Sequence, residues 1–386
     1  MTMLSRRSVI GGGAALAAGV PFGRALAAAG RPPFISRIVL ENGRVWIGAM
    51  LDGKGPFFFV LDTGSGLSFI EDSFARRRGL SSRPGQRRFG IGGGVSEYSN
   101  YVAKEVRLAS GIRFNNMVFA GTRDGLLGAD LVGGFGSGLF TSYDSDLDFV
   151  KGEWRAYTDG RPDFAGLSRV KSRFTMKDVA PKIVMDAQVD GFAGEFIMDT
   201  GFSRALSLDG RATAKSGLWD DSRPYVPTEA RGFGAAGIPT RLVRAEKLSF
   251  GGHAIERPLV SLSAPGTISH ETAGLIGLEA IGRFHLTTRV SDGSLWIAPN
   301  GLTPRAFGYR LSGLWLTEKG GQVTISDVGT GSPAAAAGVK KGDVLKGGDL
   351  STLIRNTNGA PGKQVTLEIE RGGAAQTISY TLRPWL

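Results

Sequence analysis

The pattern of apolar and polar positions repeats along the chain. Residues 46–64 and residues 183–201 each predict a strand, a turn and a second, more apolar strand that leads into Asp-Thr-Gly. A helical stretch follows each Asp-Thr-Gly and ends in Gly-Leu, at 79–80 and at 217–218. Because a glycine-rich segment comes next in both copies, we expect a hairpin tip in each.

Both copies continue through short strands to a Gly-apolar-apolar-Gly segment, at 125–128 and at 274–277, and close with a hairpin around a glycine turn. The Asp residues of the two copies, Asp62 and Asp199, lie 137 positions apart (199 − 62). This separation is too long for a solenoid repeat, whose period is about 20 to 50 residues. It indicates two duplicated lobes of mainly β structure.

The sequence changes in character after Pro299. Strand patterns at 314–316 and 322–325 precede a short alanine-rich helix, which Pro333 starts and Gly338 ends. The predicted organisation is a signal segment at 1–29, a first lobe at 30–165, a second lobe at 166–300 and a small domain at 301–386.

Composition and charge exclude several classes of function. The 59 glycines favour strands and hairpins, and the net charge of +11 comes from scattered residues without a dense basic stripe, so we expect no nucleic-acid partner. The chain has no cysteine, which excludes disulfides, thiolate metal sites and a cysteine nucleophile. Its three histidines show no paired ligand spacing, so we expect no metal. The glycine-rich segment at 90–94 lacks the G-x-G-x-x-G pattern of nucleotide sites, so we expect no cofactor.

The N-terminal residues predict export. A twin arginine, Arg6-Arg7, precedes an apolar stretch rich in Gly and Ala, and Ala25-Leu26-Ala27 offers small residues at signal-peptidase spacing. We expect a periplasmic protein exported by the twin-arginine route; the alternative is an uncleaved anchor in the inner membrane that faces the periplasm. No later stretch reaches the roughly 20 apolar residues of a membrane span.

The two Asp-Thr-Gly segments are the candidate chemistry. One copy alone would be an ordinary turn, but two copies in matching contexts predict that Asp62 and Asp199 meet at a pseudo-twofold axis. Like charges at that distance cannot both be ionised, so the pair would share one proton and act as base and acid on a water molecule. The residues expected to support these loops are Thr63, Gly64, Ser65, Thr200, Gly201, Leu127, Gly128, Ile276 and Gly277.

With these motifs the sequence resembles the bacterial retropepsin-like aspartyl proteases that carry a fused PDZ domain. The resemblance implies two pseudo-symmetric β-barrel lobes in one chain, as in pepsin-like enzymes, followed by a small α+β PDZ domain. It also implies an aspartic endopeptidase that acts as a monomer on envelope polypeptides. Flaps would fall near 90–100 and 232–239, with Gly92, Gly93 and Tyr98 as candidates for covering the substrate.

Two departures from this pattern lead to further expectations. Ser65 follows the first Asp-Thr-Gly whereas Phe202 follows the second. A hydroxyl there can bond an ionised carboxylate and lower its pKa, so we expect Asp62 to be the more readily ionised partner. In the PDZ-like segment only residues 346–348 replace the usual strand and turn.

The role of the PDZ-like segment therefore stays open. It either binds the C terminus of a peptide by strand addition or only packs on the lobes. The candidate peptide-binding residues are Gly313, Leu314, Trp315 and Leu316. A second hypothesis for the whole chain is a non-catalytic, two-lobed binding protein that recognises partners through this segment.

Overall fold

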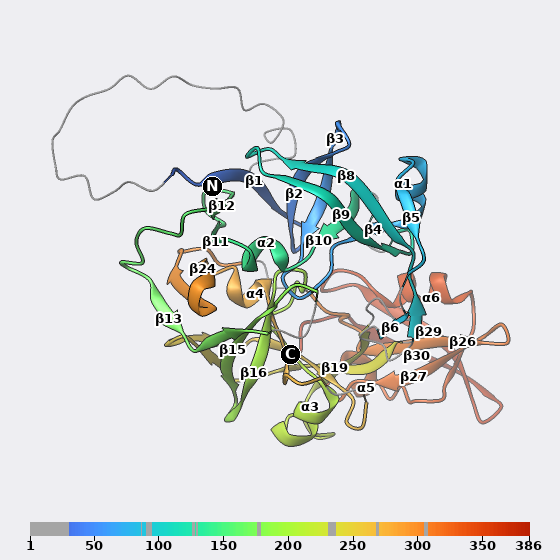
Figure 1. Ribbon diagram of the computed structural model, residues 1–386. Helices are drawn as coiled ribbons and strands as arrows, with labels where there is room; N and C mark the ends of the chain where they lie inside the picture. The colour runs from blue at the N-terminus through green and yellow to red at the C-terminus, as the bar shows by residue number, and fades with distance from the viewer. Residues whose placement is uncertain are drawn as a thin grey trace.

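The computed structural model describes residues 31–85, 87–89, 95–125, 128, 130–175, 179–230, 237–267, 270–304 and 308–386. These residues form two lobes and a C-terminal module (residues 308–386), coloured from blue to red along the chain in Figure 1. Strands predominate over a few short helices, so the prediction of a mainly β protein is confirmed. No helix in the described ranges is long and apolar enough to cross a membrane.

The first lobe contains β1 Phe34–Glu41, β2 Arg44–Leu51, β3 Lys54–Leu61, β4 Phe69–Glu71, β5 Ser81–Arg83, β6 Arg87–Phe89, β7 Val95–Glu97, β8 Asn100–Leu108, β9 Arg113–Thr122, β10 Leu131–Phe135, β11 Asp144–Asp148 and β12 Glu153–Tyr157, with helices α1 Asp72–Arg77 and α2 Gly138–Thr141. Its strands enclose apolar side chains such as Phe59, Phe119 and Phe135, whose rings pack within 6.1 Å of one another. Strand β3, which leads to Asp62, therefore lies in the centre of a packed core.

The second lobe contains β13 Ser168–Val170, β14 Ser172–Phe174, β15 Ile183–Val189, β16 Phe192–Asp199, β17 Leu206–Leu208, β18 Tyr225–Ala230, β19 Ile238–Arg244, β20 Lys247–Phe250, β21 His253–Glu256, β22 Leu259–Ser263, β23 Gly274–Gly277, β24 Phe284–Arg289 and β25 Ser294–Pro299, with helices α3 Gly210–Ser216 and α4 Leu278–Ile281 and the 3-10 turn η2 Val290–Asp292. Asp209 caps α3 by accepting a hydrogen bond from the Ala212 N–H, and Gly217 ends the helix with φ of 70°.

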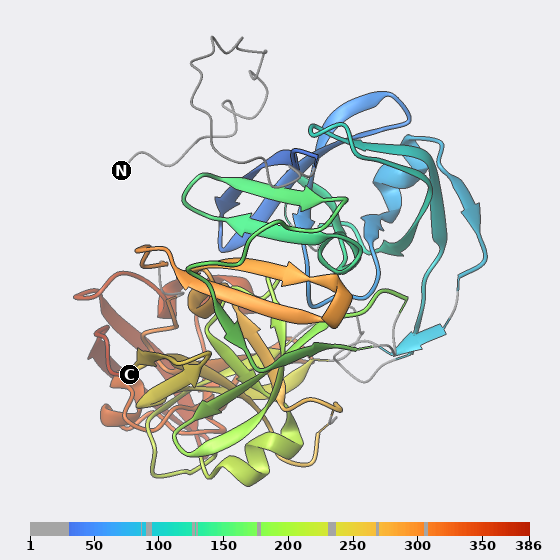
Figure 2. The ribbon, with the colours of Figure 1, turned by 60° about the vertical axis from the view of Figure 1, so that its left-hand side comes forward.

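A sheet with strands from both lobes joins them. Its strands follow the order β13-β25-β24-β11-β12-β1, and β11 of the first lobe pairs with β24 of the second. Figure 2 shows the green β11–β12 hairpin above the orange β24–β25 hairpin. Both hairpins turn at a glycine with positive φ, Gly152 and Gly293, as the two closing hairpins of the sequence repeat predicted.

The C-terminal module contains β26 Leu314–Lys319, β27 Gln322–Val328, β28 Val344–Leu345, β29 Gln364–Arg371 and β30 Ala374–Thr381, with helices α5 Pro333–Ala336 and α6 Leu350–Thr357. The strands pair in chain order, and the module has its own apolar core. Pro333 stands in the first turn of α5, which Ser332 caps. Strand β28 has two residues, in keeping with the short segment at 346–348.

Candidate active site

Each Asp-Thr-Gly follows the central strand of its lobe. Strand β3 lies between β2 and β10, and strand β16 lies between β15 and β23. Strand β10 runs parallel to β3, and β23 runs parallel to β16. At the ends of these pairs the Asp62 N–H donates to the Phe135 carbonyl at 2.8 Å, and Asp199 lies beside Gly277. The two loops are therefore held in equivalent positions by equivalent strands.

Reciprocal hydrogen bonds between two threonines join the loops. The Thr63 hydroxyl donates to the Met198 carbonyl at 2.7 Å, and the Thr200 hydroxyl donates to the Leu61 carbonyl at 2.6 Å. Each hydroxyl also accepts from the backbone N–H of the opposite threonine, at 3.1 Å and 3.0 Å. Since Thr63 is 1% and Thr200 0% exposed, water cannot replace these bonds.

Backbone N–H groups hold each carboxyl group from its own loop. Asp62 Oδ1 accepts from Gly64 at 3.1 Å and from Ser65 at 3.0 Å. Asp199 Oδ1 accepts from the corresponding N–H groups of Gly201 at 2.8 Å and Phe202 at 3.1 Å. The hydrogen bonding of the two carboxyl groups is thus nearly symmetric.

Each carboxyl group also lies against the glycine of the opposite loop. A Cβ atom on Gly64 would lie 2.3 Å from Cγ of Asp199, and one on Gly201 would lie 2.7 Å from Cγ of Asp62. Both distances are below any normal contact between carbon atoms. Glycine is therefore required at both positions for the carboxyl groups to approach each other.

Burial raises the pKa of both carboxyl groups. The pKa of Asp199 lies well above the ordinary value because the charge of Asp62 adds to the effect of burial. At Asp62, burial is opposed first by the hydrogen bond from the Ser65 N–H, then by those with Asp199 and Gly64, and last by the positive charge of Lys182, all of which lower the pKa. The protonated form is thus favoured more strongly at Asp199 than at Asp62.

The role predicted for the Ser65 hydroxyl was wrong. This hydroxyl donates to the Leu67 carbonyl at 2.7 Å, and only the Ser65 backbone N–H reaches Asp62. Because Phe202 supplies an equivalent N–H to Asp199, the Ser/Phe difference does not distinguish the two loops. The difference arises within the pair itself, because the interaction between the two carboxyl groups lowers the pKa of Asp62 and raises that of Asp199. The charge of Lys182 lowers the pKa of Asp62 further, and the position of Lys182 in the sequence gave no signal of this.

The prediction that Leu127-Gly128 supports the first loop also needs correction. Leu127 lies outside the described residues, and a Cβ on Gly128 would meet no atom within 4 Å. Strand β10 takes the place expected of that segment, because it runs parallel to β3 as β23 runs parallel to β16. A Cβ on Gly136, just after β10, would lie 2.7 Å from the Leu67 carbonyl, and one on Gly277 would lie 2.3 Å from the Arg204 carbonyl.

In the second lobe the expected segment does lie beside the loop. Strand β23 is the Gly274–Gly277 segment, and its Ile276 is fully buried next to Met198. Gly133-Gly134-Phe135-Gly136 is its counterpart in the first lobe. The signal that sequence analysis missed is a second glycine-rich apolar run a few residues after the one selected.

Some of the flap and PDZ-like candidates lie outside the described residues, and others have buried side chains. Gly92 and Gly93 lie outside the described residues, while strands β6 and β7 on either side of them pair as an antiparallel hairpin. Tyr98 follows β7 and is partly buried. Leu314 and Leu316 point into the core of the module, so only their backbone could contact a peptide.

The other two candidates in the module lie near its first strand. Trp315 packs under the guanidinium of Arg310, 4.8 Å from the ring centre. Gly313 has φ of 74° and lies next to Trp385. No ligand-facing role follows from these positions alone.

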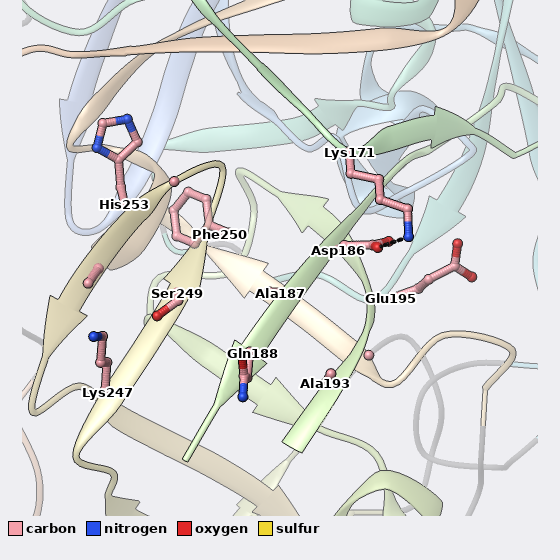
Figure 3. Close-up of a pocket in the computed structure, with 13 residues that line it drawn as sticks. Lys171, Asp186, Ala187, Gln188, Ala193, Glu195, Lys247, Ser249, Phe250 and His253 are labelled. Atoms are coloured by element: carbon pink, nitrogen blue, oxygen red, sulfur yellow. Dashed lines mark ion pairs between the residues drawn. The ribbon is translucent and has the colours of Figure 1, made fainter. Parts of the chain in front are cut away.

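A pocket of about 770 Å³ lies elsewhere on the second lobe. Figure 3 shows it over β15, β16, β20 and β21, with Lys171 paired to Asp186 at its wall and His253 across from them. The Lys171 Nζ and Asp186 Oδ2 atoms are 2.6 Å apart. Neither Asp62 nor Asp199 lines this pocket.

Comparison with known proteins adds a family match for the first lobe. Residues 47–131 match a family described as aspartyl protease. A probable CtpA-like serine protease of Staphylococcus saprophyticus is 36% identical over 75 residues, which is 17% of this chain, and the chain spans only 15% of that relative's length. The crystal structure of basic 7S globulin from soybean aligns with a TM-score of 0.39 and 11% identity over 72% of this chain and 99% of the globulin. The segment that carries Asp62 is therefore similar in sequence to aspartyl proteases.

Proposed function

We propose that the protein is an aspartic endopeptidase in which Asp62 and Asp199 activate a water molecule. The observation that carries this proposal is the set of reciprocal hydrogen bonds made by Thr63 and Thr200, which brings the half-buried Asp62 and the buried Asp199 together from separate lobes. The match of residues 47–131 to an aspartyl protease family supports it.

The unequal pKa shifts suggest the roles of the two groups. Asp62, with the lower pKa, is the ionised base and takes one proton from water as the water oxygen bonds to the peptide carbonyl carbon. Asp199 is protonated and donates its proton to the carbonyl oxygen. The product of this step is a tetrahedral diol, with the negative charge now on Asp199.

Collapse of the diol breaks the C–N bond. The proton on Asp62 passes to the leaving nitrogen, and one diol hydroxyl returns its proton to Asp199 as the carbonyl reforms. The products are a carboxylic acid and an amine, and both aspartates regain their starting protonation states. Every proton transfer in this scheme uses one of the two carboxyl groups.

The setting of this activity is also proposed. The twin-arginine segment supports export to the periplasm, either in free form or with an N-terminal anchor in the inner membrane. Substrates would be envelope polypeptides, and the C-terminal module would position substrates or partners, in the manner of a PDZ domain. We expect a monomer, since one chain supplies both aspartates.

The test compares Asp62→Asn, Asp199→Asn and the control Asp186→Asn. Asp186 lies in the second lobe, as Asp199 does, but it lines the pocket in Figure 3 and is not part of the carboxyl pair. With an unfolded polypeptide as substrate at acidic pH, either dyad substitution should lower the cleavage rate by about 10² to 10⁴. Asp186→Asn should cleave as the unmodified protein does.

The alternative is a two-lobed binding protein without catalysis. Cleavage that survives both dyad substitutions would point to a contaminating protease and overturn the proposal. A complete absence of cleavage by folded protein across acidic pH and many polypeptides would favour the binding protein. A statine-containing peptide inhibitor should abolish cleavage by the unmodified chain.

A further inference from the structure

The last two residues of the chain dock on the second lobe. The backbone N–H groups of Trp385 and Leu386 both donate to the Tyr309 hydroxyl, at 2.8 Å and 2.9 Å. The backbone oxygen of Leu386 accepts from Nη2 of Arg244, the last residue of β19, at 3.3 Å. These bonds turn the end of the module toward the β18–β19 hairpin.

Apolar contacts reinforce this docking. Val226 of β18, Leu242 of β19 and Leu259 of β22 form a small buried cluster on the outside of the main core. The side chains of Tyr309, Trp385 and Leu386 pack against this cluster, and the rings of Tyr309 and Trp385 meet edge to face at 5.9 Å. Residues Trp385 and Leu386, which we call the tail, therefore bury apolar surface of the hairpin.

Glycines of the module leave room for the Trp385 ring. A Cβ atom on Gly313 would lie 3.1 Å from the ring, and one on Gly329 would lie 3.0 Å from it. A Cβ on Gly329 would also lie 1.9 Å from the Tyr225 carbonyl. A larger residue at this position would force β18 and the module apart.

Strand β18 is bonded directly to the end of β27 and to the loop after it. The Tyr225 N–H donates to the Thr330 carbonyl at 3.3 Å, and the Tyr225 hydroxyl donates to Asp327 at 3.0 Å. The Thr330 hydroxyl donates to the Asp221 carbonyl at 3.0 Å. The guanidinium of Arg241 in β19 stacks on the Tyr225 ring, 3.9 Å from the ring centre, so the contact continues into the hairpin.

The position of this hairpin in the lobe gives the contact its significance. Strand β18 is an edge strand of the second-lobe sheet and pairs with β19 alone among the described strands. In the first lobe β5 pairs with β8 in the same way, with the β6–β7 hairpin continuing beyond that pair. The β18–β19 hairpin is thus the second lobe's counterpart of the expected flap.

We propose that the C-terminal module, through Tyr309 and Trp385, is a positioning element that holds the β18–β19 hairpin as one wall of the substrate cleft. This inference rests on the proposed peptidase function for its catalytic consequence. Its structural part, the fixing of β18 by the tail, stands independently. Loosening the tail should weaken substrate binding without changing the ionisation of the dyad, because neither residue is in the two catalytic loops.

The experiment uses the full chain with Trp385→Ala, Tyr309→Phe and the control Tyr380→Phe. The control makes the same chemical change as Tyr309→Phe, but the Tyr380 hydroxyl has no hydrogen-bond partner within the described part of the chain. Hydrogen exchange is followed in β18, and KM and kcat are measured on an unfolded polypeptide across pH. Trp385→Phe tests rescue, because it keeps an aromatic ring in the glycine-lined slot.

Loss of the two hydrogen bonds to Tyr309 should speed exchange in β18 by about tenfold or more. Trp385→Ala should do the same and raise KM with an unchanged pH profile, while Tyr380→Phe and Trp385→Phe stay close to the unmodified protein. Unchanged exchange in β18 for both Trp385→Ala and Tyr309→Phe would overturn the inference. Faster exchange with unchanged KM would overturn its catalytic part, and failure of the dyad substitutions to affect cleavage would overturn the proposed function alone.

Discussion

The hydroxyl of Thr200 offers a sharp test of how the two lobes are joined. The substitution Thr200→Val keeps the branched shape of the side chain and removes the hydroxyl. It leaves the Leu61 carbonyl without its 2.6 Å donor and the Thr63 N–H without its 3.1 Å acceptor. Both groups are at the centre of the protein, where Thr200 is 0% exposed.

The magnitude follows from counting the groups left unpaired. A buried polar group without a partner costs about 1 to 3 kcal/mol, so two such groups lower the free energy of unfolding by about 2 to 6 kcal/mol. Thr200→Ser keeps the hydroxyl and loses one methyl group, for which about 1 kcal/mol is expected. The valine variant should therefore be the less stable one although it is closer in shape.

Urea unfolding of the purified chain measures both changes. A matched control is Thr213→Val on α3, where the side chain is also buried but its hydroxyl lies 3.5 Å from the nearest carbonyl acceptor. This control should lose less than about 1 kcal/mol, because a hydrogen bond of that length contributes little. If Thr200→Val unfolds at the same urea concentration as Thr200→Ser, the threonine bonds do not hold the loops together.

Three predictions concern ionisation. Ser65→Ala should leave the pH–activity profile unchanged, since its hydroxyl bonds a backbone carbonyl; a shifted acidic limb would contradict the structure. Lys182→Met should raise the pKa of Asp62 and move the acidic limb to higher pH, whereas Lys171→Met should not. Asp199 has a raised pKa in the folded state, so its stabilising protonation is lost as the pH rises through that pKa. Asp199→Asn should therefore gain stability over the unmodified protein between acidic and neutral pH, and a pH-independent difference in unfolding free energy would refute this.

Much of the site was predictable because it depends on local patterns. The short apolar runs before Asp62 and Asp199 form strands β3 and β16 in the predicted places. Gly79 and Gly217 adopt φ of 69° and 70° at the ends of the two predicted helices. A few neighbouring residues determine conformations of this kind, so they can be predicted from the sequence.

The remaining features depend on contacts between distant residues. The Gly-apolar-apolar-Gly pattern led to the prediction that the segment with Gly125 and Gly128 supports the first loop. A Cβ at either position, however, would meet no atom within 4 Å. Gly133 is required because a Cβ there would lie 2.2 Å from the Phe69 carbonyl, a neighbour known only once β10 is placed beside β4. The same holds for the tail, because no local pattern around Trp385 indicates that it reaches β18.

Among the described residues, two well-separated sets of hydrogen bonds join the lobes. One is the pair of threonine bonds below the carboxyl groups, and the other is the sheet in which β11 pairs with β24. In that sheet the Thr287 hydroxyl donates to Asp146 at 2.8 Å, and the Thr288 hydroxyl donates to the Phe140 carbonyl at 3.0 Å. Two attachments of this kind oppose hinge motion between the lobes.

Under the proposed peptidase function, access of a polypeptide to Asp62 and Asp199 would then depend on the smaller hairpins. Among the described strands β6 and β7 pair with each other in a separate two-stranded sheet, whereas β18 is bonded to the C-terminal module through Tyr225. The two hairpins should therefore differ in mobility, with slower hydrogen exchange in β18 than in β6 and β7. Because the module contacts both β18 and β19, substitutions in the tail should reduce this difference by speeding exchange in the β18–β19 hairpin.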